Sequence, residues 1–144
     1  MDSKEVFTEW MDAHRDEFLA DLKRLVAVKS VKGQPLPGAP FGKGPHDALL
    51  CAMALFKKYG FAAKNYDGYA CTADLCDGKR ALDILAHLDV VGEGAGWDTD
   101  PYTVVLKEDG CVYGRGTADD KGPALAALYA MRAVKELDLK PEKN

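Results

Sequence analysis

The sequence predicts an α/β fold in which amphipathic helices pack against a mixed sheet. Three segments repeat apolar residues every three or four positions, which is the spacing of one helix face. Short strand-like runs lie between them, beside the turn-forming pairs Asp77-Gly78 and Asp109-Gly110. Helical and strand-like segments therefore mix along the 144 residues, and no internal repeat is visible. We expect three layers, with the first and third helices packed against a sheet that contains residues 81–86.

Three helices are expected from these apolar patterns. The first covers roughly residues 4–28, the second runs from Pro45 to Tyr59, and the third starts near Pro123. Proline suits the first position of a helix, and Gly60 is a suitable stop for the second one. The apolar faces of the first and third helices are carried by Phe7, Met11, Phe18, Leu22, Leu25, Leu125, Leu128, Tyr129, Val134 and Leu137.

Four strands are expected, joined in pairs by the two Asp-Gly turns. The pairs are residues 69–75 with 81–86, and residues 102–107 with 111–113. Ile84 and Leu85 are neighbours that point to opposite sides of a strand. They would supply one apolar side chain to each face of a sheet that is covered on both sides. The segment 31–44, with its many prolines and glycines, is expected to be a loop.

Composition and charge exclude several classes of protein. Hydrophobic residues make up 47% and charged residues 29%, which is typical of a globular, soluble chain. The net charge is -4 and Lys and Arg do not cluster, so we expect no nucleic-acid partner. No apolar run approaches the roughly 20 residues of a membrane helix, so we expect no membrane partner. The mixed, acidic N-terminus does not resemble a secretion signal, so we expect a cytoplasmic protein.

The four cysteines, Cys51, Cys71, Cys76 and Cys111, form no Cys-x-x-Cys pair. Buried free thiols in a reducing compartment are the simplest interpretation. A disulfide bond or a structural zinc knuckle remains open as an alternative.

The residues that carry chemistry lie between positions 84 and 122. His87 and Asp89 follow an apolar run and, two residues apart, face the same side of the expected strand. Imidazole is a good zinc ligand, and a nearby carboxylate can fix its tautomer and orientation. Alone, however, this pair more often has a purely structural role.

A second candidate motif is the glycine-rich loop that leads into the third helix. It contains Asp119 and Asp120, and its glycines would let the backbone approach a metal ion closely. Either aspartate could instead simply cap the third helix. A phosphate-binding loop is excluded, because neither glycine-rich phosphate motif has its required spacing here.

Taken together, the motifs resemble the M20 family of metallopeptidases, and within it the PepV-type bacterial dipeptidases. The resemblance spans nearly the whole chain, and its parts occur in the family's order. They are Pro40-Phe41-Gly42-Lys43-Gly44-Pro45, then His87-Leu88-Asp89-Val90-Val91, then Gly96-Trp97 with Pro101-Tyr102, and finally Tyr113-Gly114-Arg115-Gly116 with Asp119, Lys121 and Gly122.

The resemblance implies roles for individual residues. His87 would bind one of two active-site zinc ions, Asp119 would bridge both ions, and Asp89 would act in catalysis by orienting His87. The peptide bond between Asp119 and Asp120 would be cis, while Lys121, Arg115 and the glycines would only shape the loop. The fold implied is a three-layer, mixed-sheet zinc-peptidase catalytic domain, of which residues 1–144 would form the N-terminal part.

The chain also departs from the family pattern. It contains neither the pair of consecutive glutamates that supplies the general base and a further ligand, nor the lid domain and C-terminal catalytic part. His14 and His46 do not replace the family's final histidine ligand. We therefore expect the 144-residue chain alone to bind zinc poorly and to be inactive. We also expect self-association through apolar residues of the third helix, such as Leu128 or Val134.

The function implied is that of a dinuclear zinc dipeptidase that hydrolyses small peptides with a metal-activated water. One alternative is an N-acyl amino acid deacylase of the same family, of the desuccinylase or deacetylase type. Another is that the isolated chain is a non-catalytic, self-associating module.

Overall fold

The structure is a computed structural model that describes residues 2–139, 141 and 143–144. It has the expected mixture of helices and strands, so the α/β class is confirmed. The elements, in chain order, are α1 (Ser3–Ala13), α2 (Arg15–Val26), α3 (Lys43–Lys58), β1 (Ala63–Tyr66), β2 (Ala70–Ala73), β3 (Val105–Leu106), β4 (Val112–Tyr113) and α4 (Lys121–Glu136).

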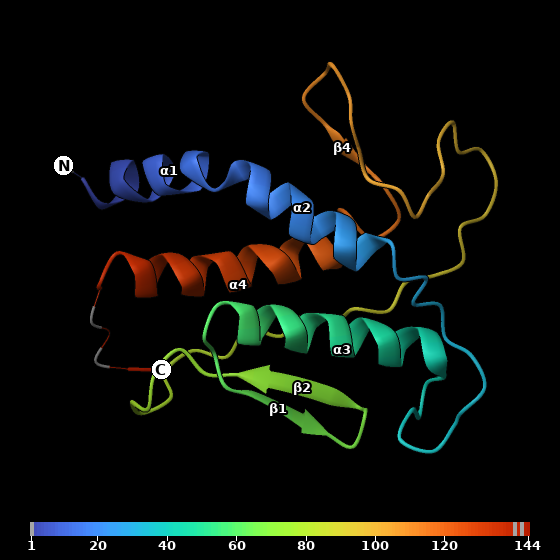
Figure 1. Cartoon of the computed structure of the whole chain (residues 1–144), viewed down its shortest axis with the longest axis horizontal. Helices are drawn as coiled ribbons and strands as arrows, with labels where there is room; N and C mark the ends of the chain where they lie inside the picture. Colours follow the sequence, from blue (N-terminus) through green and yellow to red (C-terminus); the bar gives the residue numbers. More distant parts are fainter. Residues whose placement is uncertain (1, 140, 142) are drawn as a thin grey trace.

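The helices form the body of the molecule. In the view of Figure 1, α4 is drawn between the α1–α2 pair and α3, with the β1–β2 hairpin beyond α3. Helix α2 packs against both α4 and α3, and α1 packs against α2 and α4. Their apolar faces meet in one core, as the helical spacing of these residues requires. The core is made of Trp10, Leu22, Leu25, Val26, Ala52, Leu55, Phe61, Val104, Leu125, Leu128, Tyr129 and Ala133.

The first predicted helix is two helices, α1 and α2, separated at His14. The backbone of His14 leaves helical geometry (φ −107°, ψ 9°). Its Nδ1 atom lies 2.7 Å from the carbonyl oxygen of Trp10, and its ring stacks on the indole at 4.0 Å between centroids. The His14 side chain thus contacts a backbone carbonyl oxygen of the preceding helical turn. The apolar spacing could not reveal this break, because it continues in register on both sides.

Helices α3 and α4 occur where the sequence predicts them, each starting two residues before its proline. Gly60 has a positive φ of 74° and follows the end of α3, as predicted. The apolar surface expected on α4 is wrong: Leu128 is buried and Val134 is half-buried, because α1 and α2 pack against this helix. Leu128 is therefore not part of an exposed surface, and self-association of the chain stays a prediction.

The strands agree only in part with the prediction. β3 and β4 form the expected antiparallel hairpin around Asp109-Gly110. β2 lies within predicted strand 69–75, but its partner is β1, which the sequence did not reveal. The strand predicted at residues 81–86 is not formed. No described strand pairs with this segment along its length. The expected layer of sheet under the first and third helices is accordingly not formed by the described residues.

A buried carboxylate joins three helices inside the core. Asp21 of α2 is 1% exposed and accepts hydrogen bonds from Lys58 Nζ at 3.0 Å, from the Tyr129 hydroxyl at 3.0 Å and from the Tyr59 hydroxyl. Burial and the neighbouring carboxylate raise the pKa of the Tyr129 hydroxyl. Asp21 is the shared hydrogen-bond acceptor of side chains from α4 and from the end of α3. Its carboxylate therefore fixes how α2, α3 and α4 pack.

We predict that Asp21→Ala lowers the free energy of unfolding by about 3 kcal/mol, because it leaves a lysine and two hydroxyls without their shared partner. The matched control is Asp47→Ala, which removes an exposed pair with Lys43 on the surface of α3 and should cost less than about 0.5 kcal/mol. Urea unfolding followed by circular dichroism measures both. Equal losses in the two variants would contradict this role for Asp21.

Candidate active site

His87 lies in an extended segment, and the residues that follow it, 88–90, are hydrogen-bonded to Ser30. The buried hydroxyl of Ser30 donates to the Leu88 carbonyl at 2.6 Å, and the amide of Val90 donates to the Ser30 carbonyl at 3.1 Å. These two bonds attach the segment to the chain just after α2. Ser30 could not be predicted from the sequence, because a single serine in a loop has many possible roles.

Asp119 lies in the loop 114–120 that leads into α4. Gly116 has a φ of 91°, which glycine adopts at little cost. Gly122 packs so closely that a Cβ atom there would lie 1.9 Å from the carbonyl oxygen of Thr117. The Asp119–Asp120 peptide bond is cis, as the family resemblance implied. The glycines therefore allow the tight path that carries both aspartates to the front of α4.

Lys121 anchors this loop to the interior. It is fully buried, and its Nζ atom donates to the carbonyl oxygens of Leu25 at 2.8 Å and Val28 at 2.7 Å, at the end of α2. Burial lowers the pKa of this ammonium group to about 8. The sequence assigned Lys121 a part in shaping the loop but did not reveal its burial or its contacts with α2.

These two anchored segments bring the predicted site residues together. His87 Nε2 lies 2.9 Å from Asp119 Oδ1. On the other side of the ring, Nδ1 lies 3.1 Å from the Asp89 carbonyl oxygen and 3.4 Å from its carboxylate. The side chains of His87 and Asp119 are 51% and 86% exposed, so both can be reached from solvent. The contact joins positions 32 residues apart in the sequence.

Asp120 contributes a contact that the sequence did not predict. Its Oδ2 atom accepts a hydrogen bond from the backbone amide of His87 at 3.1 Å. Asp120 occupies the N-cap position of α4, but its side chain makes no capping hydrogen bond. The helix-cap interpretation therefore does not describe how this side chain is used. Asp120 instead fixes the backbone that carries His87.

A second polar cluster joins the remaining motif residues. The Glu93 carboxylate pairs with Lys29 Nζ at 2.6 Å and accepts from the Tyr102 hydroxyl at 2.9 Å. Its carbonyl oxygen accepts from the Trp97 indole at 2.7 Å and from Arg115 at 3.0 Å. The hydrogen bond from Lys29 lowers the pKa of Glu93 to about 2. The cluster thereby connects the loop after His87 to the loop before Asp119.

The donor atoms at His87 and Asp119 fit a zinc ion. Imidazole nitrogen and carboxylate oxygen are both ordinary ligands, and two such atoms on a tetrahedral zinc lie about 3.3 Å apart. The observed 2.9 Å separation would need only a small side-chain rotation. Within residues 2–139, 141 and 143–144, no cluster of three or more His, Cys, Asp or Glu side chains could hold a metal. His87 and Asp119 are therefore a pair of candidate ligands and not a complete site.

Comparison with known proteins agrees with this geometry. Residues 84–144, which include His87, Asp89 and Asp119, match the model of Peptidase family M20/M25/M40. Over 142 residues and 96% of its length, the chain is 41% identical to the Beta-Ala-Xaa dipeptidase of Lactobacillus delbrueckii subsp. lactis. Residues 84–144 belong to peptidase family M20/M25/M40. Peptidases of this family are metal-dependent, which agrees with the donor atoms found at the site.

Other members of the family extend the resemblance. The putative dipeptidase YtjP of Bacillus subtilis is 36% identical over 90% of the chain. The crystal structure of human carnosine dipeptidase 1 superimposes with a TM-score of 0.73 at 29% identity, over 95% of this chain and 32% of that one. The chain spans about 30% of the length of the curated relatives it matches. The resemblance therefore covers nearly all of this chain and about a third of each relative.

Two further findings bear on the environment of the chain. Among the described residues, no helix is both long enough and apolar enough to span a membrane. Cys51, Cys71, Cys76 and Cys111 are free thiols, the first three half-buried and the last exposed.

We predict that the imidazole of His87 titrates above the ordinary histidine value in the metal-free chain. Partial burial opposes its protonation, but hydrogen bonds to Asp89 and Asp119 outweigh burial and raise the pKa of His87. Asp119→Asn should lower this pKa, whereas Asp12→Asn on the exposed face of α1 should leave it unchanged. NMR titration in the presence of a chelator measures both. An unchanged His87 pKa in Asp119→Asn would contradict the contact.

Proposed function

We propose that residues 1–144 form the metal-binding, N-terminal part of the catalytic domain of a cytoplasmic dipeptidase. The observation that carries this proposal is the 2.9 Å contact between His87 Nε2 and Asp119 Oδ1. Both residues occupy ligand positions in the motifs of the family, and the structure joins them from two separate segments. Such convergence of a histidine and a carboxylate at an exposed surface is typical of a metal site.

The side chains have distinct roles in this proposal. His87 and Asp119 hold the metal, and Asp119, with two carboxylate oxygens, can be shared by two zinc ions. Asp89 accepts from Nδ1 of His87 through its backbone oxygen and so presents Nε2 to the metal. Asp120 holds the His87 backbone, and Lys121 holds the loop that carries Asp119. Bound zinc would supply an activated water and polarise the carbonyl of the peptide bond to be cleaved.

Dipeptides are the proposed substrates of the enzyme to which this segment belongs. The support comes from the relatives, which carry the names Beta-Ala-Xaa dipeptidase and putative dipeptidase at 35–41% identity. An N-acyl amino acid deacylase would use the same two ligands, so His87 and Asp119 do not separate the two reactions. A polypeptide of the relatives' length that carries this segment should hydrolyse a dipeptide panel faster than N-acetylated amino acids.

We predict that the 144-residue chain binds zinc weakly and does not hydrolyse dipeptides. Four-ligand zinc sites in small domains bind with about 10–16 kcal/mol, so two ligands should give a Kd of roughly 1–100 μM. Isothermal titration measures this value. His87→Ala and Asp119→Asn should each abolish the binding, while Asp12→Asn should leave it unchanged. Nanomolar binding of two zinc ions with rapid dipeptide turnover would overturn the proposal.

A chimera tests the catalytic role of His87 directly. The matching 142-residue segment of the Lactobacillus Beta-Ala-Xaa dipeptidase would be replaced by this chain. We expect the chimera to hydrolyse dipeptides, and His87→Ala to lower kcat/KM by more than the 10–100-fold that is typical of residues beyond the ligand shell. Asp12→Asn is the control. A folded chimera whose activity is indifferent to His87→Ala would contradict the assignment.

A further inference from the structure

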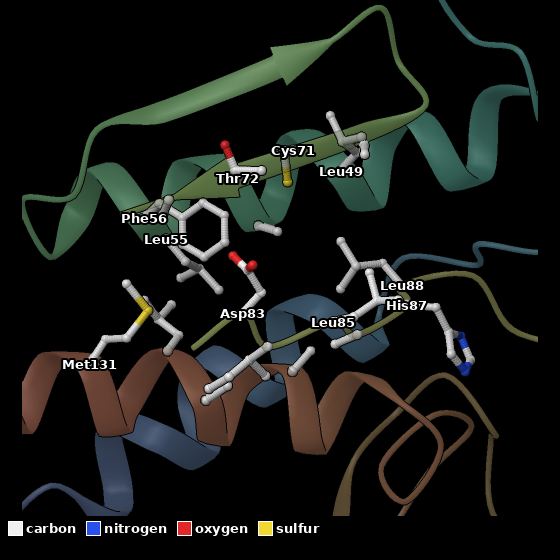
Figure 2. Close-up of a pocket in the computed structure, with 18 of the residues that line it drawn as sticks. Leu49, Leu55, Phe56, Cys71, Thr72, Asp83, Leu85, His87, Leu88 and Met131 are labelled. Atoms are coloured by element: carbon white, nitrogen blue, oxygen red, sulfur yellow. The ribbon is translucent and has the colours of Figure 1, made fainter. Parts of the chain in front are cut away.

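The segment that carries His87 is attached to the rest of the chain mainly on one side of this residue. Figure 2 shows residues 83–88 running along an apolar groove of about 870 Å³ between β2 and α4. Among the described residues, no backbone hydrogen bond reaches residues 83–86. The position of His87 therefore depends on hydrogen bonds made by His87 itself and by the residues that follow it.

Glu93 provides one of these attachments through its side chain. The carboxylate pairs with Lys29 Nζ at 2.6 Å and accepts from the Tyr102 hydroxyl at 2.9 Å. Lys29 directly precedes Ser30, whose hydroxyl and carbonyl groups bond to the backbone of residues 88–90. The side chain of Glu93 therefore adds a second attachment between the His87 segment and the chain just after α2.

The backbone of Glu93 reaches the segment that carries the other candidate ligand. Its carbonyl oxygen accepts from the Trp97 indole at 2.7 Å and from Arg115 Nη2 at 3.0 Å. The Arg115 guanidinium lies 5.3 Å from the centroid of the Trp97 ring, and the Arg115 amide donates to the Pro101 carbonyl at 2.6 Å. Arg115 lies in the loop that leads to Asp119. Glu93 therefore connects the two ligand-bearing segments.

The charges of this cluster support the same contacts. The hydrogen bond from Lys29 lowers the pKa of Glu93 to about 2, and the same bond raises the pKa of Lys29. An exposed ion pair alone contributes little to stability. Here the pair shares one residue with hydroxyl, indole and guanidinium donors, so a change in its charge affects a connected network.

We propose that Glu93 is a positioning residue of the candidate metal site, which holds the His87 segment against the loop that carries Asp119. The inference rests on the proposed function. The two candidate ligands lie on separate segments, so their 2.9 Å contact depends on what joins these segments. The apparent affinity for a metal falls with the fraction of time in which both ligands are in place. Loss of the Glu93 contacts should therefore weaken metal binding without removing a ligand.

Hydrogen exchange in the metal-free chain tests the attachment. Glu93→Gln keeps the shape of the side chain, but its amide nitrogen would face either Lys29 or Tyr102, which are both donors. The backbone amides of His87 and Val90 donate to residues outside the segment and so report its attachment. We expect both amides to exchange at least about threefold faster in Glu93→Gln, measured by NMR with a chelator present.

Asp109→Asn is the matched control, because Asp109 is also an exposed carboxylate that accepts from a tyrosine hydroxyl. Its partners, the Tyr113 hydroxyl at 2.8 Å and the Cys111 amide at 2.8 Å, lie within its own hairpin. The control should leave the exchange of His87 and Val90 unchanged. Both variants should unfold within about 2 °C of the original chain, so that faster exchange does not report global unfolding.

Zinc titration by calorimetry tests whether the attachment positions the ligands. Glu93→Gln should raise the Kd for zinc about three- to tenfold, whereas Asp109→Asn should leave it unchanged. The inverted pair, Lys29→Glu with Glu93→Lys, restores opposite charges at the same two positions. It should return the Kd to within about twofold of the original value, because the ion pair is remade.

The outcomes separate this inference from the proposed function. Unchanged exchange of His87 and Val90 in Glu93→Gln would overturn the role of Glu93. Faster exchange with an unchanged Kd would also overturn it, because the attachment would then not position the ligands. His87→Ala should abolish zinc binding in either case. Unchanged binding in His87→Ala would instead contradict the metal site itself, and with it any role of Glu93 there.

Discussion

The two proposed metal ligands are both fixed to the same short stretch of chain, the end of α2 and the residues after it. Buried Lys121 donates to the carbonyl oxygens of Leu25 and Val28 and so holds the loop that carries Asp119. Ser30, two residues further on, bonds to the backbone on either side of Asp89 and so holds the segment that carries His87. The carbonyls at a helix C-terminus attract positive charge, which helps to explain why a lysine can be buried there without a carboxylate.

The ligand positions could be read from the sequence, but most of the residues that support them could not. His87, Asp89 and Asp119 have side chains whose chemistry suits a metal site, and they occur in recognisable motifs. Ser30 makes two hydrogen bonds and Asp120 one to the backbone of a distant segment, and no local pattern encodes such contacts. Helices α3 and α4 were predictable because their apolar spacing and their glycine and proline signals agree. The break at His14 depends on a ring stacking on Trp10 within an uninterrupted apolar pattern.

The strand predicted at residues 81–86 illustrates a different limit. Its composition is that of a buried central strand, yet a strand exists only when a neighbour supplies hydrogen bonds. The described residues supply one such step, at Asn144, and the rest of the segment keeps an extended path beside an apolar groove. β1 was missed for the opposite reason, since its polar, largely exposed residues carry no alternating pattern and it forms through pairing with β2.

The most direct test of the site is a zinc titration followed through the ring nitrogens of the three histidines by long-range proton–nitrogen NMR. If His87 and Asp119 hold the metal as described, only the Nε2 resonance of His87 should move strongly, while its Nδ1 stays protonated toward Asp89. The resonances of His14 and His46 should remain in place. A shift confined to His14 or His46, or coordination of zinc through Nδ1 of His87, would contradict the site.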